Sequence, residues 1–265
     1  MPGPDRAPDA AEDLALLLQA AAQAGPIALG HWKSDPQVWD KDDGAGPVSE
    51  GDLAVNAALE DHLRSARPAY GWLSEESEAD PNRLSATRTF VIDPIDGTRA
   101  YLDGQANWAI SLAVVEAGTP IAAAIAMPAK SCTYAAVIGG GATRNAAPIR
   151  ANMRADVDGA TVLTPRVTLD AANWPGGVPD INRHFRPSLA YRMALVAEGR
   201  FDAMITLRDA WEWDIAAGAL IAAEAGAQVS DRTGAPLVFN SAGALTPGVV
   251  AAANRVHQGL LARLM

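Results

Sequence analysis

The hydrophobic positions near the start of the chain recur at helical spacing, in two blocks. Residues 9–12 (Asp-Ala-Ala-Glu) have the form of a capping box, and leucines at helical spacing follow them. Residues 49–52 (Ser-Glu-Gly-Asp) form a similar box ahead of a second set of leucines. Each pattern predicts a helix. We expect residues 25–26 (Gly-Pro) to end or kink the first helix, because proline lacks the N–H that a helix interior needs, although residues 27–32 could continue as a second segment. Pro68 is expected to end the second helix. Residues 34–47, rich in Asp, Gly and Pro, are expected to be a mobile loop.

From residue 70 the apolar runs become short, and turn-forming Gly, Pro and Asp residues separate them. This change of period predicts strands, several of which share one sheet, at residues 70–73, 90–92, 108–115, 120–127 and 133–138. A loop is expected over residues 139–158. Beyond it, strand-like and helix-like segments alternate, which indicates an α/β arrangement; the strands are expected at 161–163 and 201–207, and the helices at 188–197, 215–225 and 256–264.

Length, composition and charge narrow the class of protein. A chain of 265 residues with 49% hydrophobic and 20% charged residues is globular, and its length fits one compact domain or two tightly joined halves. The net charge of −10 opposes binding to a polyanion, so no nucleic acid polymer is expected as a partner. A small phosphorylated substrate stays open, because divalent metal ions can reverse the charge of a local site.

Cysteine usage and the N-terminal residues bear on location. Cys132 is the one cysteine, which excludes an intrachain disulfide or a cysteine zinc cluster and fits a reducing compartment. Residues 1–8 are polar and Pro-rich, and we expect them to be a disordered lead without a signal peptide. The apolar runs fall short of the ~20 residues that span a bilayer. We therefore expect a cytoplasmic protein with no membrane partner.

The strongest chemical motif is the Asp-Pro-Ile-Asp-Gly-Thr segment that follows the apolar run ending at residue 92. Asp93 and Asp96 can direct their carboxylates to one point, and the carbonyl of Ile95 can add a third hard oxygen ligand. Gly97 permits an unusual backbone angle, so that its N–H group and that of Thr98 can face an anion. The alternative is an ordinary Asp-Gly turn with Thr98 as a cap.

Three further acidic elements are weaker when each is taken alone. Glu75 and Glu76 follow an apolar run, and only one of them is expected to be a direct ligand because neighbouring strand residues face opposite ways; the alternative is a solvated acidic loop. Asp214 starts an apolar helix between bulky tryptophans, where it is either a ligand or a helix cap. Asp52 is the third residue of a capping box, a catalytic carboxylate, or both.

The sequence lacks several common nucleotide-binding and catalytic motifs. It has no Walker P-loop, no GxGxxG after a strand, no HExxH and no Gly-x-Ser-x-Gly elbow, and its four histidines are scattered. Nucleotide binding through those glycine-rich loops is therefore excluded, and the scattered histidines are more typical of surface residues than of zinc ligands.

Taken together, the acidic motifs resemble the signature of the inositol monophosphatase superfamily, a group of magnesium-dependent, lithium-sensitive phosphatases. The likeness rests on residues 73–77 (Leu-Ser-Glu-Glu-Ser), 93–98 (Asp-Pro-Ile-Asp-Gly-Thr) and 213–218 (Trp-Asp-Ile-Ala-Ala-Gly), in this order and at these separations. Other landmarks at 47–52, 196–202 and 224–227 extend it over nearly the whole chain from about residue 9. The resemblance implies a layered αβαβα fold in the α/β class and allows a homodimer.

The same resemblance implies two halves and a set of roles. An N-terminal α+β half, residues 9–150, would carry the main metal motif, and a C-terminal α/β half, residues 151–265, would supply Asp214 and substrate contacts across a cleft. Asp52 and Thr98 would orient and deprotonate the attacking water, supported by Glu76. Two or three Mg²⁺ ions would be bound by Glu75, Asp93, the Ile95 carbonyl, Asp96 and Asp214, and the substrate would be contacted by Asp96, Gly97, Thr98, Ser188 and Arg192. Ser49 stands where the family more often has Thr, and the hydroxyl is kept.

The substrate is less certain from the motifs, because inositol phosphatases, fructose bisphosphatases and 3'(2'),5'-bisphosphate nucleotidases share the metal core. Residues 73–76 resemble the CysQ-type nucleotidases, and Arg192 falls where those carry a lysine that could hold a second phosphate. The alternative for Arg192 is a solvent-exposed helix residue. We expect a Mg²⁺-dependent phosphomonoesterase that converts 3'-phosphoadenosine 5'-phosphate to AMP. The alternatives are inositol-1-phosphate or another sugar or polyol phosphate as substrate, and a non-catalytic metal-binding protein of the same fold.

Overall fold

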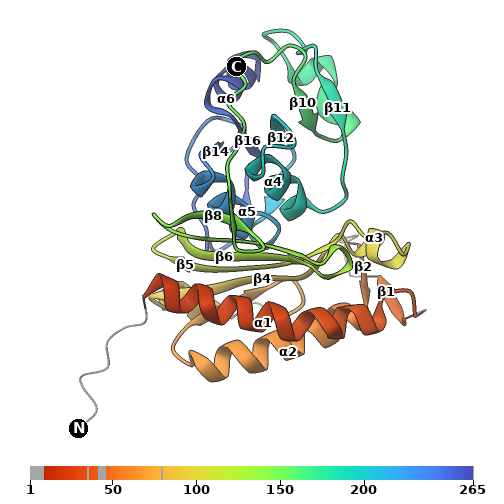
Figure 1. Ribbon diagram of the computed structural model, residues 1–265, viewed down its shortest axis with the longest axis vertical. Helices are drawn as coiled ribbons and strands as arrows, with labels where there is room; N and C mark the ends of the chain where they lie inside the picture. Colours follow the sequence, from red (N-terminus) through yellow and green to blue (C-terminus); the bar gives the residue numbers. More distant parts are fainter. Residues whose placement is uncertain (1–8, 35, 41–45, 79, 265) are drawn as a thin grey trace.

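The N-terminal part of the chain forms a seven-stranded sheet with two helices on one face (Figure 1). The structure, a computed structural model, describes residues 9–34, 36–40, 46–78 and 80–264. Helices α1 (Ala10–His31) and α2 (Glu50–Ala66) begin at the two capping boxes that the sequence predicts. The strand order is β3-β4-β5-β6-β7-β8-β9, in which only the β3–β4 pair is parallel. The strands are β3 (Gly71–Ser74), β4 (Arg88–Asp96), β5 (Ala109–Glu116), β6 (Thr119–Met127), β7 (Cys132–Val137), β8 (Gly141–Arg144) and β9 (Ala147–Ile149).

A second, five-stranded sheet lies beyond a middle layer of helices, which completes the layers αβαβα (Figure 1). Its order is β11-β10-β12-β16-β14, and its strands are β10 (Thr161–Leu163), β11 (Asn182–His184), β12 (Ala203–Thr206), β14 (Gln228–Ser230) and β16 (Val249–Ala252). The middle layer holds α4 (Leu189–Ala197) and α5 (Glu212–Glu224), and α6 (Asn254–Leu264) packs on β14 and β16. The expected fold class is confirmed.

Smaller elements complete the chain. Helix α3 (Thr98–Leu102) follows β4 directly. Two-stranded ladders pair β1 (Val38–Asp40) with β2 (Pro47–Ser49) and β13 (Ala210–Trp211) with β15 (Leu245–Thr246). Short 3₁₀ turns occur at η2 (Pro81–Ser85), η3 (Pro128–Lys130), η4 (Arg166–Leu169) and η5 (Ala171–Asn173).

Helix α1 continues through Pro26 to His31, so the helix does not end at residues 25–26; the alternative of a kink there stays a prediction. Pro26 and Ala22 lie on the exposed side of the helix, where water can satisfy the carbonyl that loses its partner. The opposite side, which includes buried Gly25 and Ala28, packs in the core with α2 and the sheet. By length and composition alone, α1 is also long and apolar enough to cross a membrane. The count of uninterrupted apolar runs in the sequence did not find it. In the structure its buried side packs in the hydrophobic core.

Two expected loops contain strands. Strands β8 and β9 lie within residues 139–158, because β8 pairs with β7 and the Glu224 carboxylate of α5 accepts 2.8 Å hydrogen bonds from the N–H groups of Gly139 and Gly141. Strand β1 lies within residues 34–47. The rest of that expectation, at residues 35 and 41–45, and the expected disordered lead at 1–8 fall outside the described residues.

The middle layer is tight because its side chains are small. Helix α5 is rich in buried alanines, and a Cβ added to Gly218 would meet Met193 of α4 at 2.7 Å. Close approach lets α5 contact β4 to β8 of the first sheet while α4 contacts β12 and β16 of the second. One hydrophobic core therefore joins the two parts of the chain, and the boundary at residue 150 stays a prediction.

Candidate active site

Three carboxylates from separate elements meet at one end of the first sheet. Glu75 follows β3, Asp93 lies near the end of β4, and Asp214 is in the first turn of α5. One oxygen from each lies within 4.8 Å of the others. Asp93 is buried, and the other two are half-buried. The sequence named all three as metal ligands, and the structure brings them together.

Strand register explains this meeting. In the parallel β3–β4 pair Ser74 is opposite Ile92, and the N–H of Glu75 continues the ladder by donating to the Ile92 carbonyl at 3.2 Å. Glu75 is thereby placed beside Asp93. On the other side of β4, Ser111 pairs with Asp93 and donates its hydroxyl to the Trp213 carbonyl at 3.0 Å. This bond holds the start of α5, and with it Asp214, against the sheet.

Asp96 lies next to the three-carboxylate cluster but faces α4. The register of β4 against β5 shifts between Asp93 and Asp96, and this irregularity redirects the side chains that follow Asp93. The Asp96 carboxylate accepts hydrogen bonds from the Ser188 hydroxyl at 2.6 Å, the Ala190 N–H at 2.6 Å and the Leu189 N–H at 3.2 Å. Asp96 is thus held by the N-terminal turn of α4, and its role as a ligand stays a prediction.

Asp52 takes part in the capping box of α2, and its carboxylate also reaches toward the Asp93–Thr98 motif, while its catalytic role stays a prediction. One oxygen accepts from the Ser49 N–H at 2.9 Å and the Ser49 hydroxyl at 2.5 Å. The other accepts from the Thr98 hydroxyl at 3.2 Å. Thr98 Oγ1 also lies 3.2 Å from the Ile95 carbonyl oxygen, so Asp52, Thr98 and Ile95 form one polar group.

The turn between β4 and α3 depends on glycine. Gly97 has φ +100°, in the left-handed region that favours glycine, and an added Cβ would also lie 3.3 Å from the Asn107 carbonyl oxygen. Two residues earlier, the Ile95 N–H donates to Asp93 at 2.9 Å. Glu76 is half-buried behind Glu75, and its N–H lies 3.4 Å from the Ser74 hydroxyl.

Burial and mutual repulsion make the cluster costly to ionise. Burial raises the pKa of Asp93 well above its usual range, and Glu75, Asp96 and Asp214 raise it further. Burial likewise raises the pKa of Asp214, and the negative charges of Asp96 and Glu75 raise it further. The pKa of Asp96 rises to about 6 through burial, which the hydrogen bonds from Ser188 and α4 oppose. A cation relieves such repulsion, and an all-carboxylate set of hard oxygen donors fits Mg²⁺.

The cluster faces a cavity of about 820 Å³ between the two parts of the chain. Its lining includes four carboxylates (Glu75, Asp96, Asp103, Asp214), three arginines (Arg99, Arg192, Arg208) and apolar residues (Pro165, Val167, Phe185, Pro187, Leu189). The cavity thus combines cation ligands with groups that attract an anionic, partly apolar molecule.

Arg192 lies in the cavity wall and is buried, so the alternative of a solvent-exposed helix residue is wrong. Its Nε donates to the Arg186 carbonyl at 2.5 Å, and one Nη lies 3.3 Å from the Pro187 carbonyl. Its guanidinium lies over the Phe185 ring, 4.5 Å from the centroid. Burial lowers the pKa of Arg192 to about 10, against the attraction of Asp96. Contact with a second phosphate stays a prediction.

Sequence reasoning missed much of the cavity lining, including Phe185 and Arg208, and it missed the structural role of Glu212. Phe185 and Arg208 stand in no motif, and only their approach to the site in three dimensions reveals them. Glu212 stands beside Asp214 in the sequence, yet it accepts the N–H groups of Asn240 and Ser241 at 2.5 and 3.0 Å. Glu212 therefore anchors a loop.

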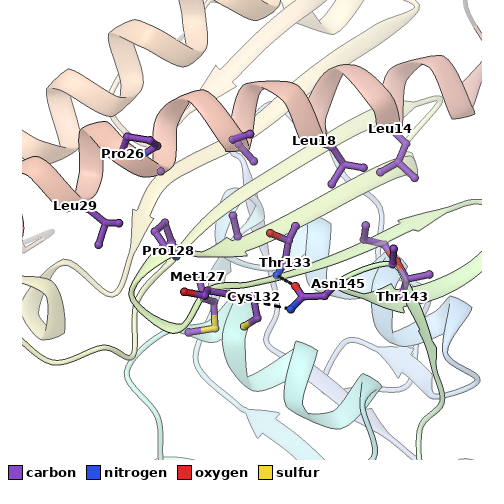
Figure 2. Close-up of a pocket in the computed structure, with 17 residues that line it drawn as sticks. Leu14, Leu18, Pro26, Leu29, Met127, Pro128, Cys132, Thr133, Thr143 and Asn145 are labelled. Atoms are coloured by element: carbon purple, nitrogen blue, oxygen red, sulfur yellow. Dashed lines mark hydrogen bonds between the residues drawn. The ribbon is translucent and has the colours of Figure 1, made fainter.

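A second cavity, of about 530 Å³, lies between α1 and strands β6 to β8 (Figure 2). Leu14 and Leu18 line it from the helix, and Met127 and Cys132 line it from the sheet side. No Asp, Glu, Lys or Arg is among its lining residues in the described part of the chain. It is a mainly apolar groove, and the carboxylate cluster is not part of it.

Comparison with known proteins agrees with this geometry. A family model described as the inositol monophosphatase family matches residues 9–265. An inositol-1-monophosphatase of Rhizobium meliloti is 35% identical over 71% of this chain and 73% of its own. A 3'-phosphoadenosine 5'-phosphate phosphatase of Mycobacterium leprae is 33% identical over 76% and 75%. The Nus factor SuhB of Escherichia coli K12 is 30% identical over 95% of both.

Among solved structures, the IMPase of Thermotoga maritima superposes with a TM-score of 0.82 at 26% identity and covers 96% of both chains. The fold and the acidic cluster define a layered α/β protein with a candidate carboxylate metal site. The chain belongs to the inositol monophosphatase family, a family of metal-dependent phosphatases that act on small phosphorylated substrates.

Proposed function

We propose that this protein is a Mg²⁺-dependent phosphomonoesterase that hydrolyses 3'-phosphoadenosine 5'-phosphate to AMP and phosphate. One observation carries the proposal: the carboxylate cluster of Glu75, Asp93 and Asp214 adjoins a cavity that arginines and apolar residues also line. The carboxylates suit a cation that receives the scissile phosphate, and the arginines suit a second anionic group.

In this proposal Glu75, Asp93 and Asp214 hold Mg²⁺, and the Ile95 carbonyl and Asp96 complete the set. Bound there, Mg²⁺ supplies positive charge that neutralises the phosphate and makes a bound water more acidic. The remaining chemistry belongs to side chains near the cluster.

Asp52 and Thr98 are proposed to orient the attacking water and take its proton, with Glu76 in support. Burial raises the pKa of Asp52, which favours a carboxylate able to accept a proton, and the 3.2 Å contact with Thr98 places the hydroxyl and the carboxylate together. The N–H groups of Gly97 and Thr98 at the start of α3 are proposed to hold the phosphate oxygens. In-line attack then releases the alcohol of the substrate.

The aromatic and basic residues of the cavity wall favour a nucleotide as substrate. Phe185 lines the cavity with 47% of its surface exposed, and its ring offers a face for a base while Arg192 covers it from another side. Arg192 belongs to the same wall, and Ser188 is buried beside it, where its hydroxyl donates to Asp96; both are proposed to shape the substrate site. Inositol has no aromatic group that would use Phe185.

The first alternative substrate is inositol-1-phosphate or another polyol phosphate, which the name of the Rhizobium relative favours. The second alternative is a non-catalytic metal-binding protein of the same fold. Against it stands the meeting of all three carboxylates with Asp52 and Thr98 nearby. A cytoplasmic location is part of the proposal and fits the free thiol of Cys132. Inhibition by lithium and a homodimer stay predictions.

A substrate panel tests this function. Phosphate release is measured with 3'-phosphoadenosine 5'-phosphate, inositol-1-phosphate and fructose 1,6-bisphosphate, with Mg²⁺ and with EDTA. We expect the nucleotide to give the highest kcat/KM and EDTA to abolish activity. Asp93→Asn should remove activity, whereas Asp61→Asn, which changes an exposed carboxylate of α2, should keep it. Release from none of the three substrates would support the non-catalytic alternative.

A further inference from the structure

The cavity contains an exposed arginine, Arg208, on the short connection between β12 and β13. It stands six residues before Asp214 and lines the same cavity as Asp214 and Arg192. Its charge acts on both: it opposes the rise in the pKa of Asp214 that burial and the neighbouring carboxylates cause. Burial lowers the pKa of Arg192, the charge of Asp96 opposes this shift, and the charge of Arg208 lowers the pKa further. Arg208 thus lies in the cavity wall near both Asp214 and Arg192.

The backbone on both sides of Arg208 is held in place. One Nη of Arg232 donates to the Leu207 carbonyl at 2.6 Å and to the Asp209 carboxylate at 2.9 Å. On the strand before, Thr206 pairs with Val249 of β16. A side chain that starts from a fixed backbone loses less freedom when it binds a ligand, so Arg208 is suited to recognition.

The three arginines that line the cavity differ in whether their guanidinium groups contact other parts of the protein. Arg192 donates to two backbone carbonyls and lies over Phe185. Arg99 stands on α3, and its guanidinium lies near Gly46, the residue before β2. One Nη would be 4.0 Å from a Cβ added to Gly46. Among the described residues neither Arg99 nor Arg208 has a hydrogen bond or ion pair to a protein side chain or carbonyl. Of these two, Arg208 is the one that stands close to Asp214 in the chain and whose charge acts on both Asp214 and Arg192.

We propose that Arg208 determines specificity by binding a second anionic group of the substrate, chemically a phosphate monoester remote from the one that is hydrolysed. Arg192 then acts as a positioning residue, because it supports Phe185 and the turn that leads to Ser188. The inference rests on the proposed function, hydrolysis of the first phosphate at the carboxylate cluster. It adds the residue that binds the second phosphate.

The test uses two substrates that differ only in the second phosphate: 3'-phosphoadenosine 5'-phosphate and adenosine 3'-monophosphate. The ratio of their kcat/KM values is measured for the wild type, Arg208→Leu, Arg208→Lys and Arg255→Leu. Arg255 is an exposed arginine of α6 outside the cavity, so its variant is the matched control for loss of charge. Arg208→Leu should lower the ratio roughly 10- to 100-fold, the effect of one charge-assisted hydrogen bond, while activity on the monophosphate stays near wild type. Arg208→Lys should keep part of the preference, and Arg255→Leu all of it.

A binding measurement separates this inference from the proposed function, because it needs no turnover. Calorimetric titration with AMP and with adenosine, both in the presence of Mg²⁺, compares ligands with and without the second phosphate. Arg208→Leu should weaken AMP binding roughly 10-fold or more and leave adenosine unchanged. Equal binding of AMP by wild type and Arg208→Leu would overturn the inference even in an active enzyme. A loss of preference in Arg99→Leu or Arg192→Leu but not in Arg208→Leu would overturn it as well. Weaker AMP binding by Arg208→Leu in a protein that hydrolyses nothing would uphold the inference and reject the proposed function.

Discussion

The Ser188 hydroxyl at the start of α4 donates a 2.6 Å hydrogen bond to the Asp96 carboxylate at the end of β4. The two residues are 92 positions apart and belong to the two parts of the chain that face the cavity. Both are buried, so the bond is shielded from water. Ser188 also caps α4 through the Tyr191 N–H at 2.9 Å. One hydroxyl therefore fixes a helix start and orients a carboxylate of the candidate site.

Ser188→Ala is predicted to destabilise the fold by about 1–3 kcal/mol, because it removes a cap and leaves a buried carboxylate with one donor fewer. Urea unfolding monitored by fluorescence measures the change. Ser188→Thr keeps the hydroxyl and should recover most of the stability. A free energy of unfolding equal to wild type in Ser188→Ala would show that this bond adds nothing.

Asp93→Asn is predicted to raise the melting temperature of the metal-free protein and to abolish activity. Asparagine keeps the acceptor for the Ile95 N–H while it removes a buried charge from beside Glu75 and Asp214. Melting is measured in EDTA and in Mg²⁺. The wild type should gain stability on adding Mg²⁺, and the variant should gain much less. An identical Mg²⁺ response in both proteins would count against Asp93 as a ligand.

Metal binding is predicted to release protons near pH 6. The pKa of Asp96 is raised from 3.8 to about 6, mainly by burial, so between these values the folded protein holds a proton that the unfolded chain has lost. This contribution to stability is present below about pH 4 and is lost as the pH rises through 6. Mg²⁺ favours the ionised carboxylates and should therefore stabilise the fold more at pH 7.5 than at pH 5. Calorimetry in two buffers of different ionisation enthalpy measures the protons released, and none released at pH 6 would refute the prediction.

Thr98→Ala is predicted to lower kcat more than it raises KM. The hydroxyl lies 3.2 Å from Asp52, where it can orient the attacking water, whereas the phosphate can still bind the backbone N–H groups of Gly97 and residue 98. Steady-state kinetics on the preferred substrate separates the two parameters, and Thr98→Ser should restore part of kcat. A rise in KM alone would assign the hydroxyl to binding or capping instead.

Local signals in the sequence were enough to predict much of this molecule. Both capping boxes, the strand before Asp93 and the helix after Asp214 depend on residues close together in the chain, and each was confirmed. The layered fold followed from the spacing of the acidic motifs through their resemblance to a family. The meeting of Glu75, Asp93 and Asp214 was predicted in the same way.

Other features were decided only by tertiary contacts. Pro26 stays inside α1 because its exposed side faces water while the buried side continues to pack, a balance that local helix propensity does not contain. Strands β8 and β9 form because β7 and Glu224 provide partners for a glycine-rich segment without a strong strand pattern.

The candidate site divides in the same way. The sequence by itself determined which carboxylates stand at strand ends and helix starts, because those positions follow from local backbone geometry. Only the tertiary structure decided that Asp96 faces Ser188, that Arg192 is buried over Phe185, and that Arg208 lines the cavity. Each of these depends on how the two sheets sit on the shared helices α4 and α5. The physical reason is that burial and hydrogen bonding between distant segments set the environment of a charged side chain, and no local pattern records that environment.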